Sequence, residues 1–282
     1  MPSSQHIPRS SSTWRKWMPQ CANSTCATKS LLQTITHRKH RLNIDGQWYC
    51  GQHCFEQAIM GKMEELMTSQ SKPAKARSSR IPLGLLLLQR GILTAEQLKA
   101  ALERHRLTGV NFGEVVQQLA FATQEQVTAA VAAQWACPVF SLGDRRLEVP
   151  IRVPRQFLEL YGMLPVHFVE NERKLLIAFV SGVQHQVLYT IEHMTSCIVA
   201  PCFITAREYE SHLHSAFTTF LRDDELVFDQ IVETAEMARI TTNYVVQLAA
   251  ERVRLGKCRD YLWVRIWGRK KETDLLFRVQ SS

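Results

Sequence analysis

An internal repeat constrains the fold of this 282-residue chain more than any other feature. Between Ile81 and Leu142 one pattern occurs twice, with an offset of 29 residues that holds without a gap for about 22 residues. The aligned pairs include Gly84 with Gly113, Leu88 with Gln117, Thr94 with Thr123, Glu96 with Glu125, Gln97 with Gln126 and His105 with Gln134. Such a repeat is one supersecondary unit used twice, with each copy burying the apolar face of the other. Two copies are too few for a solenoid, so a compact pseudo-symmetric helical domain is predicted.

Each copy is expected to contain a short helix, a turn and a longer helix. The segments 94–97 and 123–126 both read Thr-x-x-Gln, a capping box that starts a helix. Gly91 is suited to the C′ position after the first short helix. The predicted apolar faces of the longer helices are Leu98, Ala101 and Leu102 in one copy and Val127, Ala130 and Val131 in the other.

The first copy also carries a family resemblance. Its pattern is Leu83-Gly84-x-x-Leu87-Leu88-x-x-Gly91-Ile92-Leu93-Thr94, followed by Leu98 and Leu102. This resembles the N-terminal domain of type II secretion and type IV pilus assembly ATPases, over residues 81 to about 217. The domain in that family has a doubled motif that opens with Arg-Leu-Gly and closes on Gln, and it binds cyclic di-GMP in some members. The resemblance implies nucleotide-binding positions at Leu83, Gly84, Leu87, Gly91, Phe112 and Gly113.

The sequence departs from the family motif at the positions most important for a nucleotide. Pro82 and Asn111 stand where the family has Arg, and His105 and Ala120 replace the closing Gln of the first copy and the Gly of the second. An arginine would supply a planar stacking surface and a charge for phosphate, and neither Pro nor Asn supplies them. The nearby arginines are Arg80 and Arg106. The repeat is therefore either a degenerate cyclic di-GMP receptor or a purely structural unit.

Four of the eight cysteines cluster near the N-terminus, as Cys21-x4-Cys26 and Cys50-x3-Cys54. In a chain without a secretory signal, clustered cysteines indicate metal binding, and two close pairs suit tetrahedral Zn²⁺. A turn at Asp45-Gly46, a short strand and a helix over Glu56–Met67 resemble a treble-clef zinc finger. Four thiolates leave no open position, so the zinc is expected to be structural. The remaining cysteines are expected to be buried hydrophobes: Cys137, Cys197, Cys202 and Cys258.

Two alternatives to a four-cysteine zinc site remain. His37 or His40 can replace one cysteine as a ligand, and the thiols can be free or redox-sensing.

The positive charge lies in the N-terminal segment. Residues 1–80 contain 12 Lys and Arg against 4 Asp and Glu, which accounts for the whole net charge of +8. Such a basic segment can bind nucleic acid, an anionic membrane surface or an acidic protein face, or it can be a solvated tail without a partner. Arg38, Lys39 and Arg41 are suited to DNA, and Trp14 and Trp17 to a protein. Composition predicts a disordered tail over 1–20 and a linker over 69–79.

Residues 143–217 are predicted to form an α/β domain in the order α-β-β-α-β-α. The expected elements are a helix at Pro154–Tyr161, strands at Leu164–Val169, Lys174–Phe179 and Ile198–Ile204, a helix at Val183–Met194, and a helix from Thr205 to Phe217. The histidines in these helices are expected on the surface: His185, His193, His212 and His214.

Residues 218–282 are predicted to contain two helices, Asp224–Ala238 and Thr241–Leu255, and a hairpin of Tyr261–Trp267 with Asp274–Val279. A helix and a hairpin resemble the small domain that precedes the motor core of the same ATPases. The alternative is an unrelated dimerisation or docking element.

The expected fold class is multidomain α+β: a zinc-binding segment (21–68), a helical doubled-motif domain (80–142), a three-stranded α/β domain (143–217), and a C-terminal helix plus β-hairpin (218–282). No Gly-x4-Gly-Lys-Ser/Thr loop or catalytic constellation occurs, so no enzyme is expected. No apolar run approaches the ~20 residues of a membrane span, and a cytoplasmic location is expected. The predicted function is a docking module with a protein partner from a secretion, pilus or signalling system. The alternative is a zinc-finger DNA-binding regulator whose repeat domain senses a signal.

Overall fold

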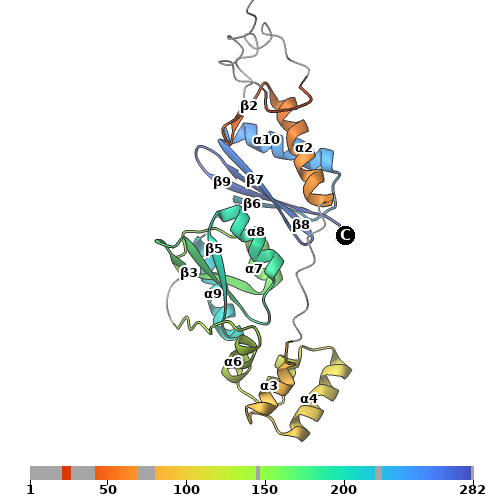
Figure 1. Ribbon diagram of the computed structural model, residues 1–282, viewed down its shortest axis with the longest axis vertical. Helices are drawn as coiled ribbons and strands as arrows, with labels where there is room; N and C mark the ends of the chain where they lie inside the picture. The colour runs from red at the N-terminus through yellow and green to blue at the C-terminus, as the bar shows by residue number, and fades with distance from the viewer. Residues whose placement is uncertain (1–20, 27–41, 69–79, 144–146, 220–223, 281–282) are drawn as a thin grey trace, which may run out of the picture.

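The computed structural model describes residues 21–26, 42–68, 80–143, 147–219 and 224–280 (Figure 1). Helices and three separate sheets confirm the multidomain α+β class. Several predicted features lie outside the described residues. These are the tail 1–20, the linker 69–79, the alternative ligands His37 and His40, and the basic residues Arg38, Lys39 and Arg41.

The doubled motif forms two helix pairs with the same local geometry. The first copy contains α3 (Leu83–Gln89) and α4 (Ala95–Thr108), and the second contains α5 (Phe112–Gln118) and α6 (Gln124–Gln134). Both predicted capping boxes are present, at Thr94 and Thr123. The N-cap residues Pro82 and Asn111 have φ/ψ of −54°/139° and −54°/135°. The backbone therefore repeats even where the side chains differ.

The longer helices of the two copies are buried to different extents. Val131 of α6 is 6% exposed, whereas the equivalent Leu102 of α4 is 45% exposed. The prediction that Leu102 lies on a buried face is wrong. The reason is that α6 also packs against strand β5 (Ile198–Phe203) of the next unit, whereas α4 packs mainly against α5 and α3 of the repeat itself.

The α/β unit has the predicted order of elements. It comprises α7 (Arg155–Tyr161), β3 (Met163–Val169), β4 (Lys174–Phe179), α8 (His185–Thr195), β5 and α9 (Ala206–Thr219). The sheet order is β3-β4-β5, with β3 antiparallel and β5 parallel to β4. The surface prediction is wrong for His212, which is 9% exposed, with its Nδ1 2.8 Å from the carbonyl oxygen of Glu208.

The C-terminal segment forms a four-stranded sheet with one helix. Its elements are β6 (Glu225–Phe228), α10 (Thr234–Gln247), β7 (Arg252–Cys258), β8 (Tyr261–Trp267) and β9 (Glu272–Arg278), in the sheet order β6-β9-β8-β7. The β8–β9 hairpin confirms the prediction, but the predicted helices Asp224–Ala238 and Thr241–Leu255 are wrong. The segments 225–228 and 252–255 are strands, and α10 stops before Ala249, which has a left-handed φ of 47°.

The N-terminal segment packs against this C-terminal sheet. It contains the hairpin β1 (Leu42–Ile44) and β2 (Gln47–Tyr49), followed by α2 (Gln52–Thr68). In Figure 1, α2 lies beside α10 although the two are far apart in sequence. The buried side of α2 consists of Phe55, Ile59 and Met63, which join one apolar cluster with α10 and β7–β9. Each such side chain contributes about 1.5–3 kcal/mol on burial.

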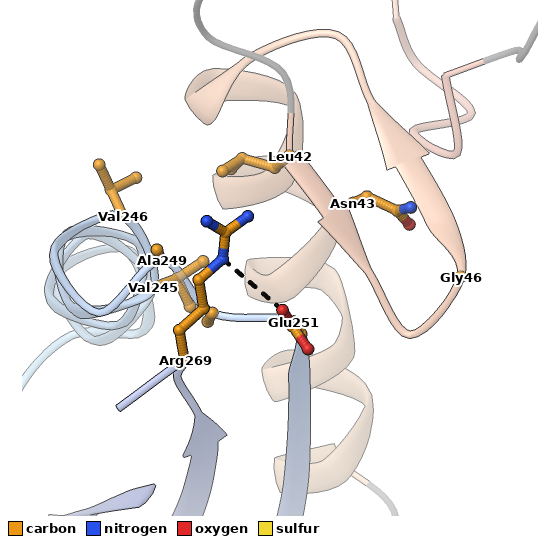
Figure 2. Close-up of a pocket in the computed structure, with 9 residues that line it drawn as sticks. Leu42, Asn43, Gly46, Val245, Val246, Ala249, Glu251 and Arg269 are labelled. Carbon is orange, nitrogen blue, oxygen red and sulfur yellow. Dashed lines mark ion pairs between the residues drawn. The ribbon is translucent and has the colours of Figure 1, made fainter. Parts of the chain in front are cut away.

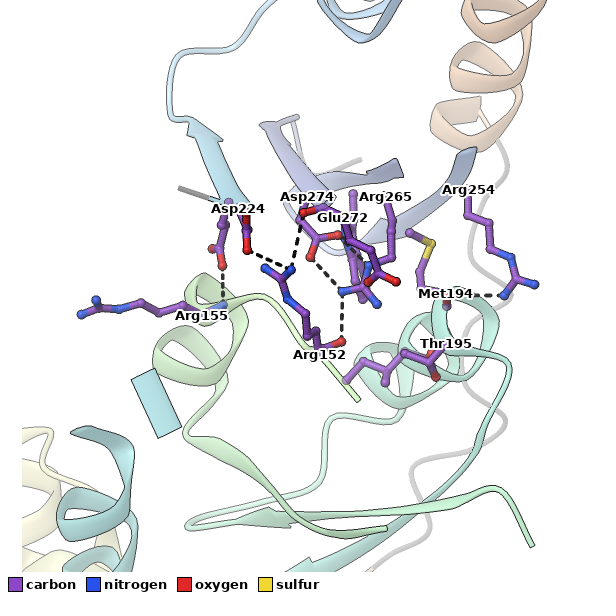
Figure 3. A network of polar contacts seen from close by, with 12 residues as sticks. Arg152, Arg155, Met194, Thr195, Asp224, Arg254, Arg265, Glu272 and Asp274 are labelled. Carbon is purple, nitrogen blue, oxygen red and sulfur yellow. Dashed lines mark hydrogen bonds and ion pairs between the residues drawn. The ribbon is translucent and has the colours of Figure 1, made fainter. Parts of the chain in front are cut away.

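The opposite face of the sheet is joined to the α/β unit through a buried ion pair (Figure 3). Asp274 Oδ1 accepts hydrogen bonds from Arg265 Nε and Trp263 Nε1, both at 2.7 Å, and Oδ2 accepts from Arg265 Nη2 at 2.8 Å. Arg265 Nη2 also donates to the carbonyl oxygen of Arg152 at 3.0 Å. Both side chains of the pair are 4% exposed, so their charges depend on these contacts.

A second contact joins β6 to the first turn of α7. The carboxylate of Glu225 accepts the backbone N–H groups of Arg155 at 2.7 Å and Gln156 at 3.0 Å. Arg152 forms an ion pair with Asp224 at 3.2 Å (Figure 3). Backbone and charged groups thus fix the α/β unit on the sheet.

Replacing Asp274 by Ala should lower the free energy of unfolding by about 3–5 kcal/mol, because it leaves the Arg265 guanidinium buried without its counter-ion. Urea denaturation measures the change. The matched control is Glu251→Ala, which breaks the ion pair between Glu251 and Arg269, whose side chains are 73% and 74% exposed. That control should change stability by less than about 1 kcal/mol. Equal effects of the two variants would contradict this account of the buried pair.

Candidate functional site

The four N-terminal cysteines converge on one point. The sulfur atoms of Cys21, Cys26, Cys50 and Cys54 all lie within 4.8 Å of one another. Cys50 Sγ lies 3.6 Å from Cys26 Sγ and 3.3 Å from Cys54 Sγ. Sulfurs at the corners of a tetrahedron with Zn–S bonds of ~2.3 Å would be about 3.8 Å apart. The cluster therefore has the size of a tetrahedral four-thiolate metal site.

A turn around Asn23 accommodates the four residues between the first two cysteines. The side-chain oxygen of Asn23 accepts hydrogen bonds from Thr25 N at 3.1 Å and Thr25 Oγ1 at 2.8 Å. Cys26 N donates to the carbonyl oxygen of Asn23 at 3.1 Å, and Ala22 N to that of Trp48 at 2.8 Å. This turn, which spacing alone did not indicate, brings both thiols to the end of β2.

The second pair is placed by the hairpin and the start of α2. Asp45 and Gly46 have φ of 54° and 74°, which suits a tight two-residue hairpin turn. Cys50 follows β2 directly, and Cys54 lies in the first turn of α2, where the helix dipole favours a thiolate. Cys50 N donates to Cys21 Sγ at 3.5 Å, a contact that also stabilises a thiolate.

The chemistry of the donor set fits a soft divalent cation. All four cysteines are free of disulfides. Burial raises the pKa of the Cys50 and Cys54 thiols, and the neighbouring thiols also raise that of Cys54. These two thiols therefore resist deprotonation by themselves, and a cation that binds them as thiolates would replace their protons.

The second candidate site is the centre of the doubled motif, where the two copies meet. A Cβ on Gly84 would lie 2.6 Å from Leu98 Cδ1 and 3.1 Å from Phe112 Cζ. A Cβ on Gly113 would lie 3.1 Å from Val127 Cγ1 and 3.5 Å from Leu83 Cδ2. Leu98 and Val127 are equivalent in the repeat, as are Leu83 and Phe112. Because each glycine has no side chain, the first helix of the other copy can lie close to its backbone. A local pseudo-two-fold axis relates the two contacts.

Hydrogen bonds between the two copies are reciprocal as well. Gln134 Nε2, at the end of the second copy, donates to the carbonyl oxygen of Ile81 at 2.7 Å. His105, its equivalent in the first copy, has Nδ1 2.5 Å from the carbonyl oxygen of Val110, which is equivalent to Ile81. The closing residue of each copy therefore fixes the start of the other, even though Gln has been replaced by His.

Most of the other predicted nucleotide positions have structural roles. Leu87 is fully buried, and Gly91 follows α3 with a φ of 67°. Arg80 lies against a neighbouring ring, with its guanidinium carbon 3.3 Å from the centroid of Trp135. Helix packing and turn geometry account for Leu83, Gly84, Leu87, Gly91, Phe112 and Gly113 without a ligand, so nucleotide binding stays a prediction.

A groove lies between the hairpin and the end of α10 (Figure 2). Its volume is about 550 Å³, and its lining includes Leu42, Val245 and Ala249. Arg269 and Glu251 also line the groove and form an ion pair, with Nε and Oε1 3.6 Å apart. The groove shows that the hairpin and α10 stand side by side, but the residues that line it form no catalytic or metal-binding set.

Among the described residues, no helix combines the length and apolar character needed to cross a membrane.

The glycine contacts predict that Gly84→Val destabilises the protein by about 1–3 kcal/mol, because the added side chain overpacks against Leu98 of the same copy and Phe112 of the other. Gly61→Val is the matched control, since Gly61 also lies in a helix but has no atom within 4 Å of an added Cβ. This control should change stability by less than about 1 kcal/mol. Chemical denaturation measures both, and a neutral Gly84→Val would refute the packing role.

Part of the chain is similar to a known protein. No family model matches the chain. A stretch of 123 residues, 42% of this chain, is 28% identical to the type IV pilus assembly ATPase PilB of Thermus thermophilus. The chain spans 14% of the length of that relative.

Two solved structures also align with about half of the chain. A structure of MshE with cdg (cyclic di-GMP) has a TM-score of 0.42 and 21% identity, covering 48% of this chain and 98% of that one. The N-terminal domain of XpsE has a TM-score of 0.40 and 12% identity, covering 50% and 98%. TM-scores of this size do not establish a shared fold. The similarity to PilB confirms the family resemblance predicted from the motif: part of this chain is similar to a type IV pilus assembly ATPase.

Proposed function

We propose that the chain is a non-enzymatic docking module that binds a protein partner in a cytoplasmic secretion, pilus or signalling assembly. The observation that carries the proposal is the 28% identity to PilB over 123 residues. The doubled motif supports it, because the two copies pack against each other as one pseudo-symmetric unit. These 282 residues contain no phosphate-binding loop, so the role we propose for them is binding rather than ATP hydrolysis.

The unequal burial of the two copies points to the docking surface. In the second copy, Val131 is buried in the helix that packs on the α/β unit. In the first copy the equivalent Leu102 is 45% exposed, and Leu85 of α3 is 49% exposed. At Leu102 the first copy thus presents to a partner a position whose equivalent in the second copy, Val131, is buried inside the molecule.

The docking proposal predicts that Leu102→Asp abolishes partner binding while the chain stays folded, because Leu102 already lies at the surface. The measurement is a pairwise two-hybrid test against the pilus and secretion components encoded by the same organism, with circular dichroism to verify folding. Ala100→Asp is the control, since Ala100 is exposed on another side of the same helix. If both variants bind as the wild type does, Leu102 is not part of the docking surface. If the wild type binds none of these components, the docking proposal itself fails.

We further propose that the doubled motif is a degenerate cyclic di-GMP receptor. Pro82 caps α3 without a side-chain hydrogen bond, and Asn111 accepts a hydrogen bond from Gly113 N at 3.1 Å. The residues that replace the family arginines thus serve the helix starts. MshE, a structural neighbour, is described with cyclic di-GMP, which makes this nucleotide the one to test.

The degenerate-receptor proposal predicts no saturable heat when the full chain is titrated with cyclic di-GMP up to about 100 µM. The Pro82→Arg/Asn111→Arg double variant should restore binding, because it returns a stacking surface and charge to both positions. Saturable binding by the wild type would show an intact receptor. No binding by the arginine variant would favour the purely structural repeat.

Zn²⁺ is the cation we propose for the cysteine cluster, because it favours tetrahedral coordination by thiolates. The site is closed, so the metal would hold the hairpin to α2 rather than activate a substrate. The DNA-binding alternative gains no support from the similarity to pilus and secretion proteins.

A further inference from the structure

The hairpin turn occupies the start of the open edge of the C-terminal sheet. Strand β7 is the last strand of the order β6-β9-β8-β7, so its outer backbone groups have no partner strand among the described residues. Asp45 N donates to the carbonyl oxygen of Glu251, just before β7, at 3.1 Å. The carboxylate Oδ2 of Asp45 accepts the backbone N–H of Val253 at 3.3 Å. One turn residue thus satisfies two of the backbone groups that an exposed sheet edge would leave open.

Helix α2 holds the other end of the same strand. Lys257 Nζ, near the end of β7, donates to the carbonyl oxygen of Met67 in the last turn of α2 at 3.2 Å. Between these two ends, Ile59 and Met63 of α2 share an apolar cluster with Val253 of β7. Helix α8 of the α/β unit contacts the second half of β7, where Thr190 Oγ1 donates to the carbonyl oxygen of Lys257 at 2.8 Å and His193 Nε2 lies 3.1 Å from that of Leu255. The hairpin is therefore the element that satisfies backbone groups at the start of β7, and α2 and α8 hold its second half.

The cysteine cluster lies where the hairpin and α2 are joined. Cys50 follows β2, and Cys54 lies in the first turn of α2, with only three residues between them. Next to the cluster, the rings of Tyr49 and Phe55 pack edge to face with centroids 5.3 Å apart. A cation bound by both cysteines would fix the angle between the hairpin and α2.

We propose that residues 42–68 and 224–280 fold as one discontinuous domain, and that metal binding by Cys21, Cys26, Cys50 and Cys54 stabilises its β7 edge. The inference rests on the proposed metal site. When the metal leaves, the hairpin loses its fixed angle to α2, Asp45 withdraws, and the carbonyl oxygen of Glu251 and the N–H of Val253 at the start of β7 open to solvent. The cysteines thus control a sheet edge that lies about 200 residues further along the chain.

The test is hydrogen exchange of the full chain, followed by mass spectrometry, before and after a chelator removes the metal in a reducing buffer. Loss of metal should lower the protection of peptides from 252–258 by about tenfold or more. Protection of β4, at 174–179 in the α/β unit, should change less than about twofold and serves as the internal reference. Equal protection of β7 with and without metal would overturn the inference.

The metal content of the same samples separates the two proposals. The proposed metal site is supported if the wild type contains about one zinc per chain. Cys50→Ser should lose this zinc, and the control Cys137→Ser should keep it. If the wild type binds no metal, the proposed metal site fails, and the coupling fails with it. If it binds metal but β7 does not respond, only the coupling fails.

A variant that keeps the cysteines tests the link itself. Asp45→Ala removes the acceptor for Val253 N, so it should leave the zinc content unchanged and lower the protection of β7 in the metal-bound chain. Asn43→Ala, an exposed change in the neighbouring strand, is the control and should leave both unchanged. If β7 is protected in Asp45→Ala as strongly as in the wild type, the hairpin turn does not couple the metal site to β7.

Discussion

The structure depends on one constraint, which is that the four-stranded sheet carries large buried apolar side chains on both faces. Val253, Val264 and Phe277 point to one side, toward α2 and α10, and Trp263 and Leu276 point to the other, toward the α/β unit. A sheet of this kind is stable only when both faces are covered. The two faces are covered by α2, α10 and the α/β unit, which come from three different parts of the chain. This arrangement brings the N-terminal and C-terminal segments together.

The sequence predicts correctly those features that local chemistry determines. Thr94 and Thr123 begin helices because a hydroxyl and a Gln three residues later satisfy free N–H groups, whatever lies around them. Strand β4, at Lys174–Phe179, has the predicted bounds. The four cysteines meet as their spacing suggests, although the Asn23 turn that allows this is visible only in three dimensions.

The features that could not be predicted depend on distant partners. Val253 and Leu255 fit a helix of period 3.6 as well as a strand of period 2, and the partner strand β8 decides between them. Leu102 and Val131 are equivalent in sequence, yet it is the helix of Val131 that packs on β5. The shared core of α2 and the C-terminal sheet has no local signal either, because Phe55, Ile59 and Met63 show only that one side of the helix is buried.

The buried ion pair has a consequence for the pairing of β8 with β9. Arg265 lies directly opposite Asp274 in the ladder. A slip by one residue would turn Asp274 toward the apolar side occupied by α10, and Arg265 would lose its partner at a buried position. Each misaligned pairing would thus bury an uncompensated charge, at a cost of several kcal/mol. The pair therefore selects one alignment of the hairpin from its near neighbours, which apolar side chains on both faces would not do.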